Sequence, residues 1–172
     1  MSKPEQSRIY TCGILTISDK GARGERQDTS GPNLRIIMAS QGFEVKWYDI
    51  VPDEERTIGK VLMKWIDELH ADLVITTGGT GVAPTDVTPE ATRRIIDREI
   101  PGIAEAMRLA SLQKTPNAVL SRGIAGIRRE SLVINLPGSK KAAAENIESV
   151  LAAIPHALDK IKGNPADCGG DP

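Results

Sequence analysis

The sequence predicts an α/β fold, a three-layer domain in which a mostly parallel sheet is flanked by helices. Segments rich in β-branched residues alternate along the chain with segments whose apolar residues recur at helical spacing. Two expected strands, residues 71–77 and 131–136, are short apolar runs of the kind that helices bury on both faces of a parallel sheet. Because helices connect the strands, the crossovers are expected to be right-handed.

The amino-terminal half alternates strand and helix. Residues 9–17 (IYTCGILTI) predict a strand, and the polar residues 20–28 predict a loop. A helix is expected from residue 31 to Gly42, a glycine suited to the position just past a helix end. Residues 43–51 alternate apolar and polar side chains, which suggests a strand near a sheet edge. The clearest helix follows, with one apolar stripe formed by Ile58, Val61, Leu62, Trp65, Ile66 and Leu69.

The second half continues the alternation. The strand at 71–77 leads through a glycine-rich stretch to a helix that starts near Pro89, with Thr88 as its N-cap. A Pro-Gly pair breaks that helix before another at residues 103–112.

The last third contains a weaker strand-and-turn region at residues 118–127 and then the strand at 131–136. A long final helix follows, which Pro155 is expected to kink or restart. Residues from about 164 onward are rich in Gly, Pro and Asp and are expected to fray. We therefore expect a single domain over residues 1–163 and a flexible tail over 164–172.

The composition argues against several classes of protein. With 22 basic and 23 acidic residues among 172, the formal net charge is −1, which indicates neither a nucleic-acid surface nor a membrane patch. Cys12 and Cys168 form no disulfide framework and no metal-ligand spacing, and His70 and His156 have no carboxylate or thiol at ligand spacing. The polar amino terminus and the lack of a long apolar run predict a cytoplasmic protein.

The stretch TTGGTGVAPTDVTPEATRR, residues 76–94, indicates an anion site. Gly78, Gly79 and Gly81 permit a close approach to the backbone and leave N–H groups able to face a guest. The stretch is not a Walker A loop, which needs a Lys-Ser/Thr pair, and it is not a dinucleotide fingerprint, whose last glycine would fall on Pro84. Taken alone, it is also compatible with a turn that only reverses the chain.

Other strand ends point to the same place. If the loops after the parallel strands meet at one edge, residues 18–19, Asp53 and residues 137–139 join the glycine stretch in one crevice. Lys140 and Lys141 open the last helix, where cations oppose the helix dipole unless an anion is bound. The alternative is that both lysines reach into water.

The acids of this crevice suggest a metal ion. Asp53 and Asp86 would repel a polyphosphate unless Mg²⁺ lay between them, and Mg²⁺ is typically held by one or two carboxylates plus substrate phosphates. As isolated acids, both would be turn formers or caps. Arg122, after Ser121, offers a planar fork suited to a phosphate or a heterocycle edge, although a lone arginine is more often a surface or salt-bridging residue. Residues 123–126 mimic the G-x-x-G of an RNA-binding loop without its basic and aromatic surroundings.

Linked sequence blocks resemble one enzyme family. The string TTGGTGVAPTDVTPEATRRIIDREIPGIAEAMR, together with LTISDKG, VPDEE, LSRGIAGIR and VINLPGS, closely resembles the molybdopterin adenylyltransferases of molybdenum-cofactor synthesis, and gephyrin's amino-terminal domain is similar too. The resemblance runs from about residue 9 to residue 163. It implies a compact α/β domain, usually a homotrimer, that binds molybdopterin and ATP with Mg²⁺. Such enzymes transfer AMP to the terminal phosphate of the pterin and release pyrophosphate, and transient contact with other molybdenum-cofactor enzymes is implied as well.

The resemblance also implies roles for individual residues. It assigns Asp53 and Asp86 to the metal and catalytic pair. It assigns substrate or nucleotide contacts to four groups: the phosphate cradle Gly78, Gly79, Thr80 and Gly81; the first strand end Ser18 and Asp19; the pterin-side segment Ser121 and Arg122; and the nucleotide-side loop Pro137, Gly138 and Ser139.

Two alternatives keep the fold and change the activity. A related bacterial branch shares the same blocks, and its members bind pterin without clear adenylation. Gephyrin uses its trimeric domain as a scaffold for partners. The presence of both acids and of the string APTD favours the enzyme, and a single domain without a long linker has little to scaffold.

Overall fold

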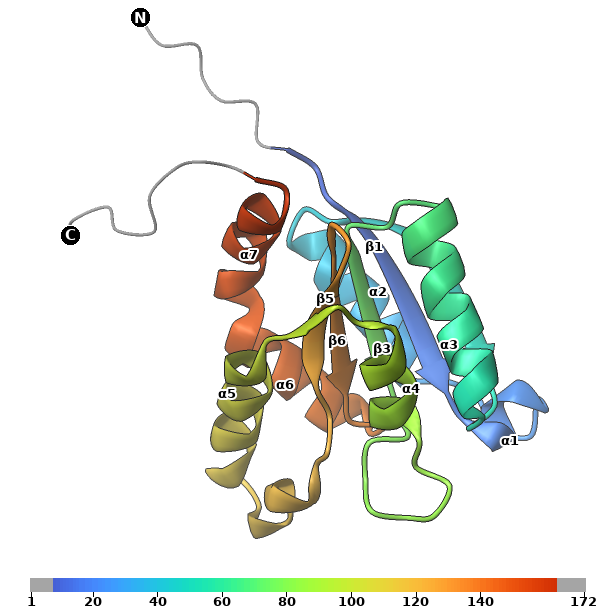
Figure 1. Cartoon of the computed structure of the whole chain (residues 1–172). Helices are drawn as coiled ribbons and strands as arrows, with labels where there is room; N and C mark the ends of the chain where they lie inside the picture. Colours follow the sequence, from blue (N-terminus) through green and yellow to red (C-terminus); the bar gives the residue numbers. More distant parts are fainter. Residues whose placement is uncertain (1–7, 164–172) are drawn as a thin grey trace, which may run out of the picture.

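A six-stranded sheet forms the middle layer of the computed structural model, which describes residues 8–163 (Figure 1). The strand order is β2-β1-β3-β6-β5-β4. Strands β1, β2, β3 and β6 are parallel, whereas β5 pairs antiparallel with both β4 and β6. The strands are β1 (Thr11–Ile17), β2 (Glu44–Val51), β3 (Leu73–Thr77), β4 (Arg98–Glu99), β5 (Ala125–Arg128) and β6 (Ser131–Leu136). The tail predicted at 164–172 lies outside the described residues.

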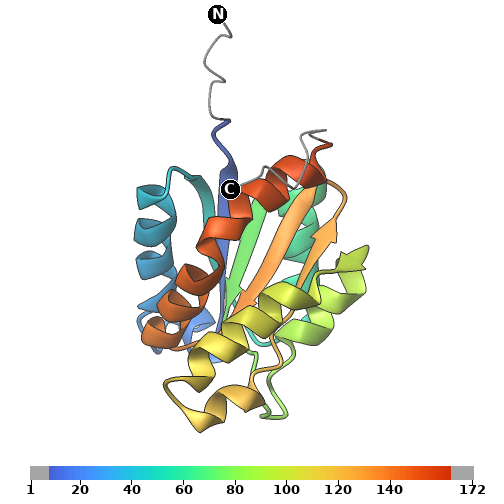
Figure 2. The ribbon, with the colours of Figure 1, turned by 90° about the vertical axis from the view of Figure 1, so that its left-hand side faces the viewer.

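Helices cover both faces of this sheet, as Figures 1 and 2 show. One face is covered by α3 (Glu55–Met63), the π-helical turn η1 (Lys64–Glu68) and α4 (Thr88–Ile95). The other face is covered by α2 (Ser30–Ser40), α5 (Pro101–Leu112), α6 (Lys140–Val150) and α7 (Ile154–Ile161). The predicted three-layer α/β fold with a mostly parallel sheet is therefore confirmed.

Two apolar clusters, one on each side of the sheet, hold the layers together. Successive strand residues alternate between them, so that Ile14 belongs to the cluster under α2 and α6 whereas Leu15 belongs to the cluster under α3. Full burial of such a side chain stabilises the fold by roughly 1.5–3 kcal/mol. In the predicted stripe on α3 and η1, Ile58 and Leu62 are fully buried. Leu69 is 38% exposed, because the regular α-helix ends at Met63 and a wider π-helical turn follows.

Three local predictions are confirmed. Strand β2 lies at the edge of the sheet. Gly42 follows the end of α2 with a φ of +84°, a conformation that glycine adopts without strain. The final helix is interrupted by the 3₁₀ turn η3 (Leu151–Ala153), and Pro155 lies in the first turn of α7, where its missing N–H leaves no hydrogen bond unmade.

Other local predictions are wrong. A short helix, α1 (Asp19–Ala22), begins just before the predicted loop and extends into it, because the Oγ of Ser18 accepts a hydrogen bond from the N–H of Gly21 and caps the helix. Thr88 is not the N-cap of α4 but its first residue, and its hydroxyl donates to the carbonyl of Gly78 instead. The two-residue β4 and the 3₁₀ turn η2 (Pro116–Leu120) are not predicted, because segments that short show no periodicity.

The strand order reverses between β1 and β3. From β1 the chain passes to β2 on one side and then crosses to β3 on the other. The parallel strands end nearly in register, since Ile17 of β1 pairs with Val51 of β2 and Thr77 of β3 pairs with Leu136 of β6. In α/β sheets, ligand-binding crevices open at such reversal points, beyond the carboxyl ends of the strands.

Candidate functional site

Two adjoining cavities open at the carboxyl edge of the sheet. The first, the α1–α2 cavity, has a volume of about 700 Å³ and lies among the loops after β1, β2 and β3 and the start of α6. The second, the α5–α6 cavity, has a volume of about 420 Å³ and lies between these two helices, η2 and the glycine stretch. Gly79 and Gly138 line both cavities, so the loops after β3 and β6 form the wall between them.

The glycine stretch passes through a space that admits no side chain. Gly78 has a φ of +102°, and a Cβ there would lie 2.2 Å from the carbonyl oxygen of Ile17. A Cβ at Gly79 would lie 2.3 Å from the Oγ1 of Thr88. The N–H of Gly78 donates to the carbonyl of Leu136 at 3.1 Å, so this residue joins β3 to β6 and has no donor left for a guest. Within the described residues the N–H groups of Gly79, Thr80 and Gly81 donate to no protein acceptor, and they remain as the donors of the predicted cradle.

Asp53 is held by a reciprocal pair of hydrogen bonds with Asp19. Its Oδ2 accepts from the N–H of Asp19 at 2.9 Å, and its own N–H donates to the Oδ1 of Asp19 at 3.0 Å. Burial raises the pKa of Asp53, and the negative charges of Asp19 and Asp86 raise it further. The hydrogen bond from the N–H of Asp19 lowers this pKa but does not outweigh the other effects. Ionisation of Asp53 is therefore less favourable in the folded protein than in water.

Asp86 lies on the opposite side of the glycine stretch. Its Oδ2 accepts from the N–H of Ala83 at 2.9 Å, and a Cβ at Gly81 would lie 2.8 Å from the same oxygen. A Cβ at Gly79 would lie 3.2 Å from the Oδ1 of Asp53. The sequence-predicted pair of acids thus flanks residues 79–81, with Asp53 lining the α1–α2 cavity and Asp86 lining the α5–α6 cavity.

This donor set suits a hard cation that brings other ligands with it. Across residues 8–163 no group of three or more His, Cys, Asp or Glu side chains is arranged to hold a metal ion. Two carboxylates whose charges repel each other fit Mg²⁺, which commonly takes one or two carboxylates and completes its shell with water and substrate phosphates. Asp53 and Asp86 are the residues that would hold it.

The loop after β6 is bonded to its neighbours on both sides. The hydroxyl of Thr77 donates to the carbonyl of Pro137, and the hydroxyl of Ser30 donates to the carbonyl of Gly138. Ser139 caps α6, with its Oγ accepting from the N–H of Ala142. The structure therefore brings all three predicted residues of this loop to the site, and Lys140 lines the α1–α2 cavity beside them.

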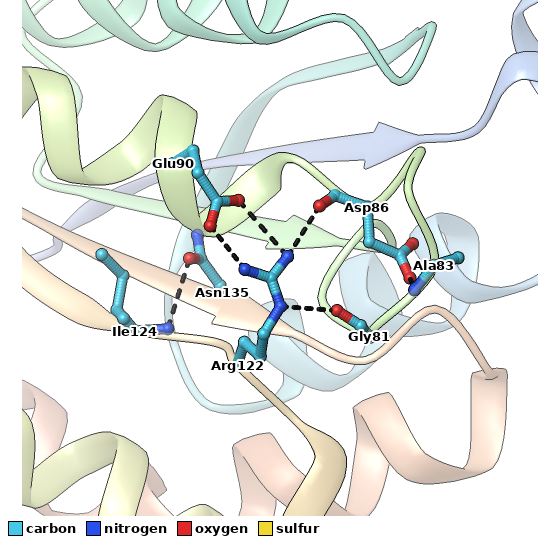
Figure 3. Close-up of polar contacts among 7 residues, drawn as sticks. All are labelled: Gly81, Ala83, Asp86, Glu90, Arg122, Ile124 and Asn135. Atoms are coloured by element: carbon cyan, nitrogen blue, oxygen red, sulfur yellow. Dashed lines mark hydrogen bonds and ion pairs between the residues drawn. The ribbon is translucent and has the colours of Figure 1, made fainter.

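Ser121 and Arg122 reach the site in different ways. Ser121 lines the α5–α6 cavity. The guanidinium of Arg122 does not line either cavity but bonds to the carbonyl oxygens of Gly81 and Asp86 and to the carboxylate of Glu90 (Figure 3). Its fork is thus directed at the protein's own loop.

An acid that the sequence patterns do not single out also lines the α1–α2 cavity. The carboxylate of Asp28 accepts hydrogen bonds from the hydroxyls of Thr16 and Tyr48 and from the N–H groups of Ser30 and Gly31. Burial alone would raise the pKa of Asp28, but these hydrogen bonds outweigh it and hold the pKa below its usual value. The sequence carries one signal for this role, an acid just before the start of a helix. The partners on β1 and β2 could be found only in three dimensions.

Together, fold and site define an α/β ligand-binding domain whose carboxyl-edge site combines unpaired backbone N–H groups with two carboxylates between two cavities. Residues 13–156 match the family model described as "Probable molybdopterin binding domain", and the chain belongs to this family. The predicted resemblance is confirmed.

Known relatives agree with this assignment. The molybdopterin adenylyltransferase of Helicobacter pylori is 45% identical over 154 residues, which cover 88% of each chain. Gephyrin of Dictyostelium discoideum is 44% identical over 166 residues, covering 91% of this chain and 23% of gephyrin. The solved structure of the molybdopterin biosynthesis enzyme MoaB from Thermus thermophilus is 55% identical, covers 92% of this chain and 100% of its own, and superposes with a TM-score of 0.86.

Proposed function

We propose that this protein transfers AMP from ATP to the terminal phosphate of molybdopterin, giving adenylated molybdopterin and pyrophosphate. The observation that carries the proposal is the placement of Asp53 and Asp86 on either side of residues 79–81, where two cavities adjoin. Two cavities with a shared wall suit a reaction that joins two substrates. The relatives named molybdopterin adenylyltransferase, 38–45% identical to this chain, support the same activity.

The linings of the cavities indicate which substrate each one takes. The α1–α2 cavity has the start of α6, with Ser139 and Lys140, beside Asp53, and we assign it to the phosphates of ATP. The α5–α6 cavity is lined mainly by apolar atoms with hydroxyl and amide groups from Ser111, Asn117 and Ser121, as a heterocycle requires, and we assign it to molybdopterin. Asp86 is then beside the pterin and Asp53 beside the nucleotide.

The reaction needs positioning more than covalent chemistry from the protein. An oxygen of the pterin phosphate attacks the α-phosphorus of ATP in line, a new P–O bond forms while the bond to the β-phosphate breaks, and pyrophosphate leaves. The N–H groups of Gly79, Thr80 and Gly81 hold the phosphates, and Lys140 attracts the pyrophosphate. A Mg²⁺ ion between Asp53 and Asp86 would offset the charge that grows on the leaving group.

The assembly we propose is a homotrimer. Three apolar side chains are exposed together on α5 and the following turn η2, namely Leu109, Leu112 and Val119. Leu109 is 64% and Val119 62% exposed, and an exposed apolar group of this kind often marks an interaction surface. A second copy of this chain would cover them, and sedimentation of the wild type against Leu109→Ser would test the interface. Dissociation of the variant is the expected result.

We place the enzyme in the cytoplasm, with molybdopterin, ATP and transient contacts to other molybdenum-cofactor enzymes as its partners. No helix among the described residues is long and apolar enough to cross a membrane.

The function is tested by pyrophosphate release from ATP and Mg²⁺, with and without molybdopterin. Wild type should release pyrophosphate only when the pterin is present. Asp86→Asn should bind the pterin but lose release, because the change removes the charge beside residues 79–81. Asp49→Asn serves as the matched control, since Asp49 is exposed and lines neither cavity. Tight pterin binding without release by the wild type would refute the adenylyltransferase and leave a binding protein.

A further inference from the structure

One arginine closes the loop that carries Asp86. The backbone N–H of Arg122 donates to the carbonyl of Thr80 at 2.8 Å. Its Nε donates to the carbonyl of Gly81 at 2.7 Å, and its Nη2 donates to the carbonyl of Asp86 at 2.7 Å. A single residue from the segment before β5 therefore ties the beginning and the end of loop 81–86 together, as Figure 3 shows.

Glu90 holds the other side of this guanidinium. Nη1 of Arg122 donates to Oε1 of Glu90 at 2.5 Å, and Nη2 donates to Oε2 at 3.3 Å. Glu90 lies in the first turn of α4, where the helix dipole favours a negative charge. The hydrogen bond from Arg122 lowers the pKa of Glu90, so the carboxylate stays ionised and the pair keeps its charge at neutral pH.

These contacts leave Arg122 little capacity for a ligand. A guanidinium has five N–H donors, and the three nitrogens of Arg122 already serve two carbonyl oxygens and both oxygens of a carboxylate. A bidentate bond to a substrate phosphate would require the arginine to release the loop or Glu90. The guanidinium of Arg122 therefore acts as a brace, a group that holds loop 81–86 in place, and it is not open to a ligand.

The brace itself rests on the buried centre of the sheet. Asn135 of β6 is 1% exposed, and its Oδ1 accepts from the N–H of Ile124, two residues after Arg122. Its Nδ2 donates to the hydroxyls of Thr76 on β3 and Thr92 on α4, both at 2.9 Å. A series of hydrogen bonds thus connects the sheet, through the segment of Arg122 and Ile124, to the loop (Figure 3).

We propose that Arg122, braced by Glu90, is a positioning residue that keeps the carboxylate of Asp86 in place over Gly81 beside the α5–α6 cavity. The expected effect on kcat rests on the proposed adenylation, whereas the expected effect on the loop at residues 80–87 does not. Arg122 acts on the reaction through Asp86 and takes no part in binding the pterin.

The test compares Arg122→Lys with Arg128→Lys. Lysine keeps the positive charge but cannot span two carbonyls and a carboxylate. Arg128 is the matched control, because it also bonds to both oxygens of a carboxylate, Asp67, and to a carbonyl, that of Ile95, and it lines neither cavity. Both variants should lose stability to a similar degree, so stability alone does not separate them.

Enzyme kinetics and hydrogen–deuterium exchange distinguish Arg122→Lys from Arg128→Lys. In Arg122→Lys, the kcat of adenylation should fall by roughly 10- to 100-fold while the KM values for molybdopterin and ATP stay within about twofold, because displacement of a reacting group by about 1 Å costs on that order. Hydrogen–deuterium exchange of residues 80–87 should become faster in this variant only. Glu90→Gln, which leaves the carbonyl contacts of Arg122 intact, should show a smaller effect of the same kind.

Either of two results would overturn the inference. A raised KM with unchanged kcat would make Arg122 a substrate ligand. Unchanged exchange of residues 80–87 would show that the loop holds its shape without the brace. A wild type that released no pyrophosphate would refute the proposed function instead, and the exchange measurement would still decide the role of Arg122.

Discussion

The sharpest prediction concerns Gly78, where β3 ends. In Gly78→Ala the new Cβ would lie 2.2 Å from the carbonyl oxygen of Ile17, a backbone atom that cannot rotate away, at a φ of +102°. The left-handed backbone costs an alanine about 1–2 kcal/mol, and overpacking costs about 1–3 kcal/mol more. The reduced entropy of the unfolded chain returns about 0.4–1 kcal/mol. We therefore expect a net loss of roughly 1–4.6 kcal/mol in the free energy of unfolding, against a total of about 5–15 kcal/mol for a typical domain.

Urea unfolding, followed by tryptophan fluorescence at one fixed protein concentration, measures this loss. Gly102→Ala is the control, because a Cβ there meets nothing within 4 Å and Gly102 lies in α5. Alanine is a better helix former than glycine by up to about 1 kcal/mol, so the control should be equally or more stable than the wild type. If Gly78→Ala unfolds within about 0.5 kcal/mol of the wild type, steric exclusion at the end of β3 is not what requires a glycine there.

Three further predictions concern pH and metal. Burial and neighbouring acids raise the pKa of Asp53, so ionisation of Asp53 lowers the stability of the folded protein. This loss of stability appears as the pH rises from the pKa of Asp53 in the unfolded chain through its pKa in the folded protein. Asp53→Asn should therefore be more stable than the wild type at pH 7, as measured by urea unfolding. Mg²⁺ at 100 times its Kd should stabilise the wild type by about 2.7 kcal/mol and the variant by much less, and equal stabilisation would place the ion elsewhere. Asp28 affects stability in the opposite direction, because its pKa is lowered in the folded protein. Ionised Asp28 stabilises the fold above the pKa of the unfolded chain, near 4, and this stabilisation is lost as the pH falls through the pKa of the folded protein. Asp28→Asn should cost about 1–3 kcal/mol at pH 7, and the difference from the wild type should shrink below pH 4.

The fold was largely predictable because hydrophobic periodicity reports which faces are buried. The apolar strands β3 and β6 show this at the centre of the sheet, and the stripe that starts at Ile58 shows it on the helix that packs against one face of the sheet. The convergence of the strand ends followed from the parallel order alone. β4 was not predictable, because its two residues pair with β5 through tertiary contacts that leave no local pattern.

The site was predictable where it depended on strand ends and less so where it depended on long-range hydrogen bonds. Asp53 and Asp86 each follow a predicted strand, so their convergence could be expected. The roles of Thr88, Asp28 and Arg122 depend on partners 10–41 residues away in the chain, and residue type does not specify such partners. Arg122 shows the limit most clearly, since the family resemblance implies a ligand contact, whereas its hydrogen bonds go to Gly81, Asp86 and Glu90 of the protein itself.

The glycine stretch and the two acids explain each other. Gly78 makes room for the carbonyl of Ile17, and Gly81 makes room for the carboxylate of Asp86. Gly79 makes room first for the hydroxyl of Thr88 and, less closely, for the carboxylate of Asp53. A side chain at Gly81 would therefore push the carboxylate of Asp86 away from the wall between the cavities, whereas one at Gly79 would first meet the hydroxyl of Thr88. The protein thus holds two mutually repelling charges close together with backbone amides, a strained arrangement that an incoming anion alone would worsen. A bound cation relieves this repulsion, so the site should discriminate against free nucleotide in favour of its magnesium complex.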